Sequence, residues 1–201
     1  MKKIVVNGVG VRKVKPDFIK VVINHEIHGK SYKKVVEDLN AKYGVLQKYI
    51  AKERFEPKNL KTVTYNINNE YRYEDGKNIN IGYVAHQVME YELENDFLVL
   101  DNFLNALHES MTYASYSISY HLKDNRKAKA EAYALAVENA KYQASLLTAL
   151  TKKKLMDIIK IEVNDQDIHQ PMMLSARHNM TEFEPKDIEV RASVVIEWEI
   201  E

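Results

Sequence analysis

The stretch VVNGVGVRKVKPD, residues 5–17, decides between two kinds of fold at the start of the chain. A dinucleotide-binding loop needs a strand, the spacing G-x-G-x-x-G, and then a helix whose N-terminus meets the phosphate. Here Lys13 stands where the third glycine is needed, and Pro16 is followed by the alternating pattern of another strand. We therefore predict that Gly8 and Gly10 lie in a β-strand, at a bulge or a close backbone approach, and bind no phosphate.

Alternation with period two predicts strands on both sides of Pro16, over residues 3–14 and 18–28. In the second strand, one face carries apolar side chains and the other carries polar ones. The apolar face consists of Ile19, Val21, Ile23 and Ile27. Further strands are predicted at about 60–74, 77–93, 114–122 and 155–163, and at 188–200, where Ile188, Val190, Ala192, Val194, Ile196, Trp198 and Ile200 share a face.

Helical spacing predicts three helices between these strands. The first begins after the N-cap Ser31 and ends near Arg54, with Val35, Leu39, Leu46 and Ile50 on its apolar face. The second follows Asn95 or Asp96 and ends near Ser110. The third covers about 125–151, with a narrow stripe of mostly small residues that lets a helix lie close to a sheet: Ala128, Ala132, Leu135, Ala136, Ala140, Ala144 and Leu147.

The predicted order is therefore β-β-α-β-β-α-β-α-β-β. It indicates an α+β fold of long antiparallel strands with three helices packed on the sheet. At 201 residues the chain can bury a sizeable core, and we expect residues 1–201 to form a single unit.

Two signals compete in the hairpin that joins the strands at 60–74 and 77–93. Asp75–Gly76 favours a two-residue turn, which would place Tyr73 opposite Asn78. A register shifted by one residue matches apolar to apolar side chains instead. It pairs Tyr73 with Ile79, Tyr71 with Ile81, Ile67 with Ala85 and Val63 with Met89. We predict this second register, and hence a loop of three or five residues.

The composition narrows the possible functions. Lys plus Arg and Asp plus Glu both number 29, so the net charge is zero, which argues against a nucleic-acid partner and leaves little repulsion between copies. The absence of cysteine excludes disulfides and thiolate chemistry. No apolar run reaches the roughly 20 residues of a membrane helix. As the sequence stands no signal peptide is present, so we expect a cytoplasmic protein, or a periplasmic or exported one if a leader has been removed.

Residue patterns typical of catalytic or metal sites are weak. His25–Glu26–Ile27–His28 falls one residue short of a zinc-protease motif, and in a strand His25 and His28 point to opposite faces. The polar connector 164–184 holds a soft donor set that suits copper, or methionines that pack on the sheet: His169, Met172, Met173, His178 and Met180. Asp165 and Asp167 fit solvated loop acids. We expect no catalytic residues and no cofactor, with an enzyme assembled only in three dimensions as an alternative.

Tyrosine is concentrated on the predicted strands: Tyr65, Tyr71, Tyr73, Tyr83, Tyr91, Tyr113, Tyr116 and Tyr120. Tyrosine suits both a strand core and a protein interface. The hairpin tip, which lacks an obvious covering helix, supplies our interface candidates Tyr71, Tyr73, Ile79 and Ile81, and we expect a homo-oligomer.

Five segments in order resemble the SIMPL domain family, which includes a bacterial periplasmic immunogenic protein. They are VNGVGVRKVKPD (6–17), the strand from Thr64–Tyr65 to Tyr71, GYVAHQ (82–87), DNRKAKAEAYALAVENAKYQA (124–144) and PKDIEVRASVVIEWEI (185–200). Departures are the missing leader, His108–Glu109–Ser110 in place of a glycine, and Pro185–Lys186–Asp187 in place of Pro-Gly-Glu. The resemblance implies an oligomeric, interaction-type role and gives no reaction. We therefore expect a non-enzymatic protein that acts by self-association or partner binding. The alternatives from the residues are soft-metal or small-ligand binding by residues 164–184, or an enzyme with a site assembled only in three dimensions.

Overall fold

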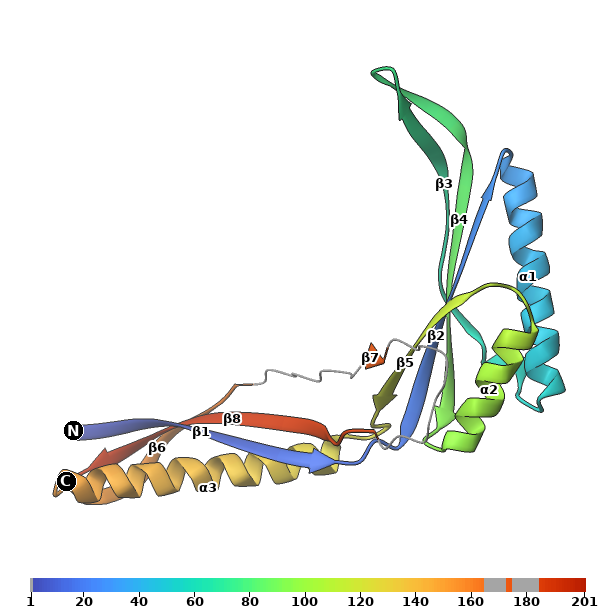
Figure 1. The fold of residues 1–201 in the computed structure, drawn as a ribbon. Helices are drawn as coiled ribbons and strands as arrows, with labels where there is room; N and C mark the ends of the chain where they lie inside the picture. The colour runs from blue at the N-terminus through green and yellow to red at the C-terminus, as the bar shows by residue number, and fades with distance from the viewer. Residues whose placement is uncertain (1, 165–172, 175–184) are drawn as a thin grey trace. The chain divides into compact units, whose positions relative to one another are not determined.

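The computed structural model describes residues 2–164, 173–174 and 185–201. Its element order is β1 (Lys2–Val14), β2 (Phe18–Gly29), α1 (Tyr32–Lys52), the 3-10 helix η1 (Pro57–Asn59), β3 (Lys61–Glu74), β4 (Lys77–Glu94), α2 (Phe97–Glu109), β5 (Ser115–His121), α3 (Arg126–Leu150), β6 (Leu155–Asn164), β7 (Met173–Leu174) and β8 (Ile188–Ile200). This confirms the predicted α+β class and order, with the short β7 as an addition (Figure 1).

Two compact units divide the chain, where the sequence leads us to expect one. The first unit contains described residues 2–16, 122–164 and 185–201; the second contains 17–121 and 173–174. Each has its own antiparallel sheet, with strand order β1-β8-β6 in the first and β3-β4-β2-β5-β7 in the second. The division follows from the pairing of β1 with β8, the two ends of the chain, rather than with β2.

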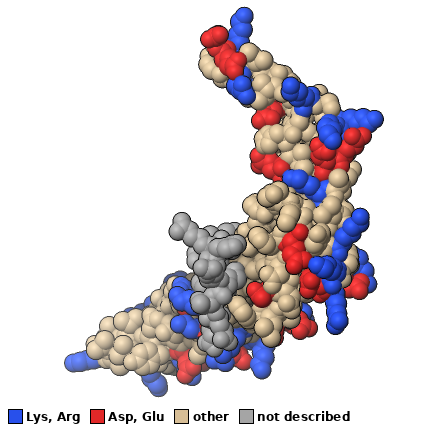
Figure 2. All heavy atoms as spheres, turned by 45° about the vertical axis from the view of Figure 1, so that its right-hand side comes forward, with Lys and Arg blue, Asp and Glu red and all other residues tan. Residues whose placement is uncertain are grey.

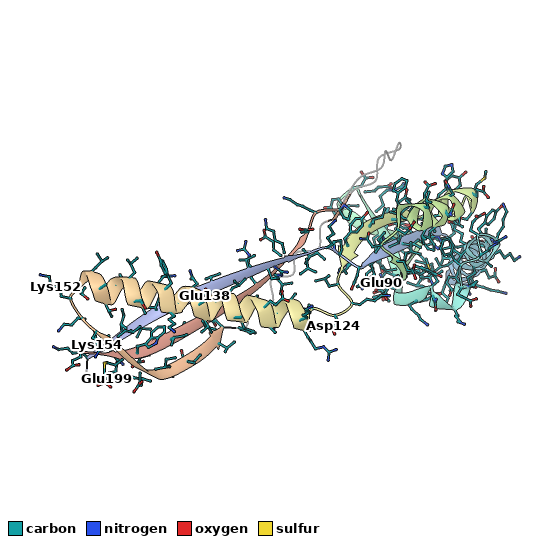
Figure 3. The ribbon with its side chains drawn as sticks, turned by 90° about the horizontal axis from the view of Figure 1, so that it is seen from below. Glu90, Asp124, Glu138, Lys152, Lys154 and Glu199 are labelled. Atoms are coloured by element: carbon teal, nitrogen blue, oxygen red, sulfur yellow. The ribbon has the colours of Figure 1, made fainter. Side chains whose placement is uncertain are left out.

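In the first unit, α3 lies along β1 and β8 (Figure 3). Its small residues are buried. Cβ atoms built on Gly8 and Gly10 would lie 2.1 Å from the carbonyl oxygen of Ala136 and 2.0 Å from that of Ala132. The predicted close approach is therefore confirmed, since only glycine leaves room for the helix backbone. The buried stripe is Ala128, Ala132, Ala136, Ala140, Ala144 and Thr148. Leu135 and Leu147, which we place in the stripe from sequence, are exposed instead because they lie a quarter turn away from it.

The side chains of α3 also cover the outer edge of β1. Asn139 Oδ1 accepts a hydrogen bond from the Val9 amide at 3.2 Å, and Gln143 Nε2 donates to the Asn7 carbonyl at 3.5 Å. An edge strand covered in this way offers fewer backbone groups to another chain. The opposite edge strand, β6, differs: among the described residues, its length beyond Leu155 is exposed.

In the second unit, α1 and α2 pack on the face of the sheet that carries Ile19, Val21 and Ile23. All four apolar residues predicted for α1 are fully buried, and Ser31 caps the helix by accepting a hydrogen bond from the Lys34 amide. Asp96 caps α2 through the amides of Leu98 and Val99. Within this core, the rings of Tyr91 and Phe103 pack at a tilt with their centroids 4.6 Å apart, and Phe55 meets both rings edge-on.

The hairpin register predicted from hydrophobic matching is wrong at the tip. Asp75 and Gly76 both have positive φ, as a two-residue type I′ turn requires, and Tyr73 pairs with Asn78 and Tyr71 with Asn80. Nearer the core, Ile67 does pair with Ala85, because Ile81 forms a bulge between the two registers. A second bulge leaves Val63 unpaired and places Thr62 opposite Met89. The turn thus sets the register at the tip and burial sets it in the sheet.

We predict that Gly8→Ala and Ala140→Leu each lower the free energy of unfolding by about 1–3 kcal/mol, because each adds atoms where β1 and α3 are in contact. Urea denaturation would measure the change. Leu146→Ala, on the exposed side of the same helix, serves as the control and should change stability by less than about 0.5 kcal/mol. An unchanged midpoint for both core variants would contradict the packing of α3 on β1.

Gly44 of α1 should be replaceable with a gain in stability. A Cβ added there meets no atom within 4 Å, so Gly44→Ala should raise the free energy of unfolding by about 0.5–1 kcal/mol through helix propensity. The contrasting variant is Gly82→Ala, where φ is +148° and the new Cβ would lie 2.4 Å from the Gly29 carbonyl oxygen. Thermal denaturation should move in opposite directions for the two variants.

Candidate functional site

The most prominent exposed feature is the tip of the β3–β4 hairpin, residues 71–81, which we call the arm (Figure 1). Toward the tip of the hairpin, the pairing of β4 with β2 ends at Tyr83, which lies opposite Gly29. Beyond it, β4 pairs only with β3 among the described residues. The arm is therefore a two-stranded ribbon with both faces open, and such ribbons gain little stability by themselves.

The four interface candidates do not form one apolar face. Tyr71 and Tyr73 lie opposite Asn80 and Asn78, so these four side chains share a face. Ile79 pairs with Arg72 on the other face, and Ile81 occupies the bulge. Tyr73 is 73% exposed and Tyr71 57%, so the tyrosine face is the more prominent of the two.

The other tyrosines divide between core and surface. Tyr91 and Tyr120 are buried, and Tyr83 and Tyr116 are half-buried. Tyr65 and Tyr113 are exposed. Burial therefore explains the tyrosines in the middle of the second sheet, while those of the arm are mostly exposed.

A second exposed apolar surface, which the sequence pattern does not predict, lies on β6. Ile158, Ile161 and Val163 pair with Trp198, Ile196 and Val194 of β8, so they lie on the side of the sheet that α3 covers. Yet α3 extends over β1 and β8, and all three β6 residues are at least half exposed. The irregular sequence LMDIIKIEV gives no clean alternation that would have revealed this exposure.

Charged side chains do not form an extended patch of one sign on the face shown in Figure 2, where blue and red atoms alternate. This distribution agrees with the zero net charge. Among the described helices, none is long and apolar enough to cross a membrane.

His25 and His28 lie on opposite faces of β2, as predicted. His28 is exposed, whereas His25 is 2% exposed and neither of its ring nitrogens has a hydrogen-bond partner among the described residues. Its neighbour across the strand pair, Gln87, donates to Thr62 Oγ1 but leaves its own Oε1 unpaired. Burial, with a contribution from the Lys42 charge, lowers the pKa of His25 to about 4. The imidazole is therefore neutral at physiological pH.

His28 is part of a polar cluster on the outer face of the second sheet. Its Nδ1 lies 3.0 Å from Glu70 Oε2 and its Nε2 lies 2.8 Å from Glu26 Oε1. His86 Nδ1 approaches the other oxygen of Glu26 at 3.4 Å. These hydrogen bonds raise the pKa of His28, that to Glu70 most. Within the described part of the chain, no group of three or more His, Asp or Glu residues is arranged to hold a metal ion.

The structure also brings together a serine and a histidine on β5 that were not among the predicted site residues. Ser119 Oγ lies 2.8 Å from His121 Nε2 on β5, and Phe18 stacks on the imidazole. The S-x-H spacing within a strand is the signal that predicts this contact, because residues two apart share a face. Ser119 pairs with Lys20 on one side and Met173 on the other, so its backbone belongs to the sheet rather than to an oxyanion-binding turn.

The connector candidates for a soft-metal site mostly lie outside the described residues: His169, Met172, His178 and Met180, together with the acids Asp165 and Asp167. Met173 lies in β7, which pairs with β5.

The buried imidazole predicts an acid-sensitive contribution to stability. Because the folded pKa of His25 lies below its ordinary value of about 6.5, the contribution is intact above that pH and is lost as the pH falls toward 4. Urea denaturation from about pH 7.5 to 4.5 should show a loss of up to about 3 kcal/mol that His25→Leu removes. His28→Gln is the matched control: the raised pKa of His28 gives its contribution the opposite pH dependence. A difference between wild type and His25→Leu that stays constant with pH would contradict a neutral buried His25.

Comparison with known proteins identifies the family. The family model described as SIMPL, protein of unknown function (DUF541), matches residues 4–198, nearly the whole chain and both compact units. A search of curated proteins finds no match. The matched range includes the glycine strand, the arm, the alanine stripe of α3 and the closing strand β8. The chain therefore belongs to the SIMPL family.

Proposed function

We propose that this protein works without catalysis, by associating with further copies of itself or with a protein partner, and that the arm forms the contact. The observation that carries the proposal is the tyrosine face of the arm, where Tyr71 and Tyr73 are exposed on a ribbon that lies beyond the neighbouring strand β2. Tyrosine combines a large apolar ring with a polar hydroxyl group. It therefore suits a surface that is exposed to water before binding and buried afterwards.

The charge distribution supports association between identical copies. With no net charge, two copies approach without the long-range repulsion that keeps strongly charged proteins apart. The asparagines opposite the tyrosines, Asn78 and Asn80, add hydrogen-bonding groups without adding charge. A second copy therefore meets an aromatic and polar face rather than a charged one.

Two rival functions remain less supported. An acyl-transfer enzyme built on Ser119 and His121 would need amide donors near the hydroxyl, and the strand pairing on both sides of Ser119 disfavours them. A soft-metal or ligand-binding role for residues 164–184 concerns mostly residues outside the described part. Metal analysis of the purified protein would favour that role if a bound soft metal were found.

Light scattering of the purified chain over a range of concentrations tests the proposal. The wild-type protein should have a mass that is a multiple of the chain mass, and Tyr71→Lys combined with Tyr73→Lys should lower it while the circular dichroism spectrum stays the same. Tyr113→Lys, which changes a more exposed tyrosine outside the arm, is the matched control and should keep the wild-type mass.

A third variant, Ile161→Lys, separates the arm from the other exposed apolar surface. If only this variant lowers the mass, the copies meet at β6 and the arm assignment is wrong. If the wild-type protein is a monomer at high micromolar concentration, self-association itself is wrong.

A further inference from the structure

The polar cluster around His28 lies at the root of the arm. At the root, Glu70 pairs with Gly82 and the next pair is Tyr71 with Asn80, so the bulge at Ile81 begins directly after Glu70. Gly82 has a φ of +148° there, and its amide donates to the Asn80 side chain at 2.9 Å. The backbone pairing of β3 with β4 is therefore irregular where the arm leaves the sheet, and side chains add contacts between the strands there.

His28 makes this connection. It lies on β2 next to the strand's last residue, Gly29, and its two nitrogens reach Glu70 on β3 and Glu26 on its own strand. Glu26 in turn contacts His86 on β4. One imidazole thus joins the edge strand that bears the arm to the central strand of the sheet.

Both contacts of His28 are made to carboxylates, which accept hydrogen bonds and do not donate them when ionised. An imidazole that donates from both nitrogens carries a positive charge. The titratable groups that face it are Glu26 from β2, Glu70 from β3 and, through Glu26, His86 from β4. The hydrogen bonds to Glu70 and Glu26 favour the charged imidazole and raise the pKa of His28.

We infer that protonated His28 is a pH-dependent brace that ties the root of the arm to β2, and that its deprotonation loosens the arm. The neutral imidazole can donate to only one of the two carboxylates at a time, so the bond from β2 to Glu70 on β3 competes with the bond to Glu26 on β2 itself and is weakened. The link from the brace to association rests on the proposed function, because the arm is the proposed contact.

Proton NMR of the histidine ring hydrogens tests the brace directly. His28 should titrate above the ordinary histidine range in the wild type, and Glu70→Gln should move its titration downward. Glu74→Gln is the matched control: it removes a carboxylate from the same strand, one that pairs with Arg72 near the turn instead of with His28. His28 titrating at the same pH in the wild type and in Glu70→Gln would overturn the inference.

Hydrogen exchange of the amides of residues 69–83 tests whether the brace holds the arm. After correction for the intrinsic pH dependence, exchange at about pH 8.5 should be about three- to fivefold faster than at about pH 5.5, the size expected for an exposed charge pair. His28→Gln should show the fast exchange at both pH values. Exchange that is unaffected by His28→Gln at both pH values would also overturn the brace.

These measurements separate the two proposals. The titration and the exchange report on a single chain, whatever its mass, whereas light scattering reports only on association. A monomeric protein with a titrating brace would refute the proposed function and keep the inference. An oligomer whose arm amides exchange independently of His28 would refute the inference and keep the proposed function.

Discussion

In the first unit two backbones approach each other too closely to leave room for a Cβ atom, that of β1 at Gly8 and Gly10 and that of α3 at Ala132 and Ala136. A helix that lies so near a strand can use only small side chains at the interface, which explains the four-residue spacing of alanines along α3. The same closeness brings Asn139 and Gln143 within hydrogen-bonding distance of the edge of β1. The position of α3, its stripe of alanines and the protection of the edge of β1 thus all depend on the absence of Cβ atoms at Gly8 and Gly10.

Much of this fold could be predicted from the sequence, since burial on one face leaves a periodic pattern. The period of two in β2 and β8 and the spacing of Val35, Leu39, Leu46 and Ile50 in α1 correspond to the buried faces observed. Periodicity identifies which side of an element is buried, but not against which element. For that reason the division into two sheets, which depends on β1 pairing with β8, could not be inferred.

The candidate site was harder to predict because it depends on register. A shift of one residue in the β3–β4 pairing sets the tyrosines of the arm opposite asparagines instead of isoleucines. The geometry of the Asp75–Gly76 turn determines this pairing. The cluster of Glu26, His28, Glu70 and His86 likewise requires the alignment of three strands before its members can be seen as neighbours. The alternation of β2 does predict that His25 and His28 have different surroundings, because the two side chains lie on opposite faces of the strand.

The bulge at Ile81 has an evolutionary consequence. It absorbs the mismatch between the alignment that the Asp75–Gly76 turn imposes and the alignment that the buried pair Ile67 and Ala85 requires. Changes of length at the tip that add or remove one residue from each strand leave the buried face in place, because the strand pairs below Gly82 keep their partners. The arm can diversify in length and sequence as an independent module, and a foreign hairpin could be grafted above Gly82 without redesigning the domain that carries it.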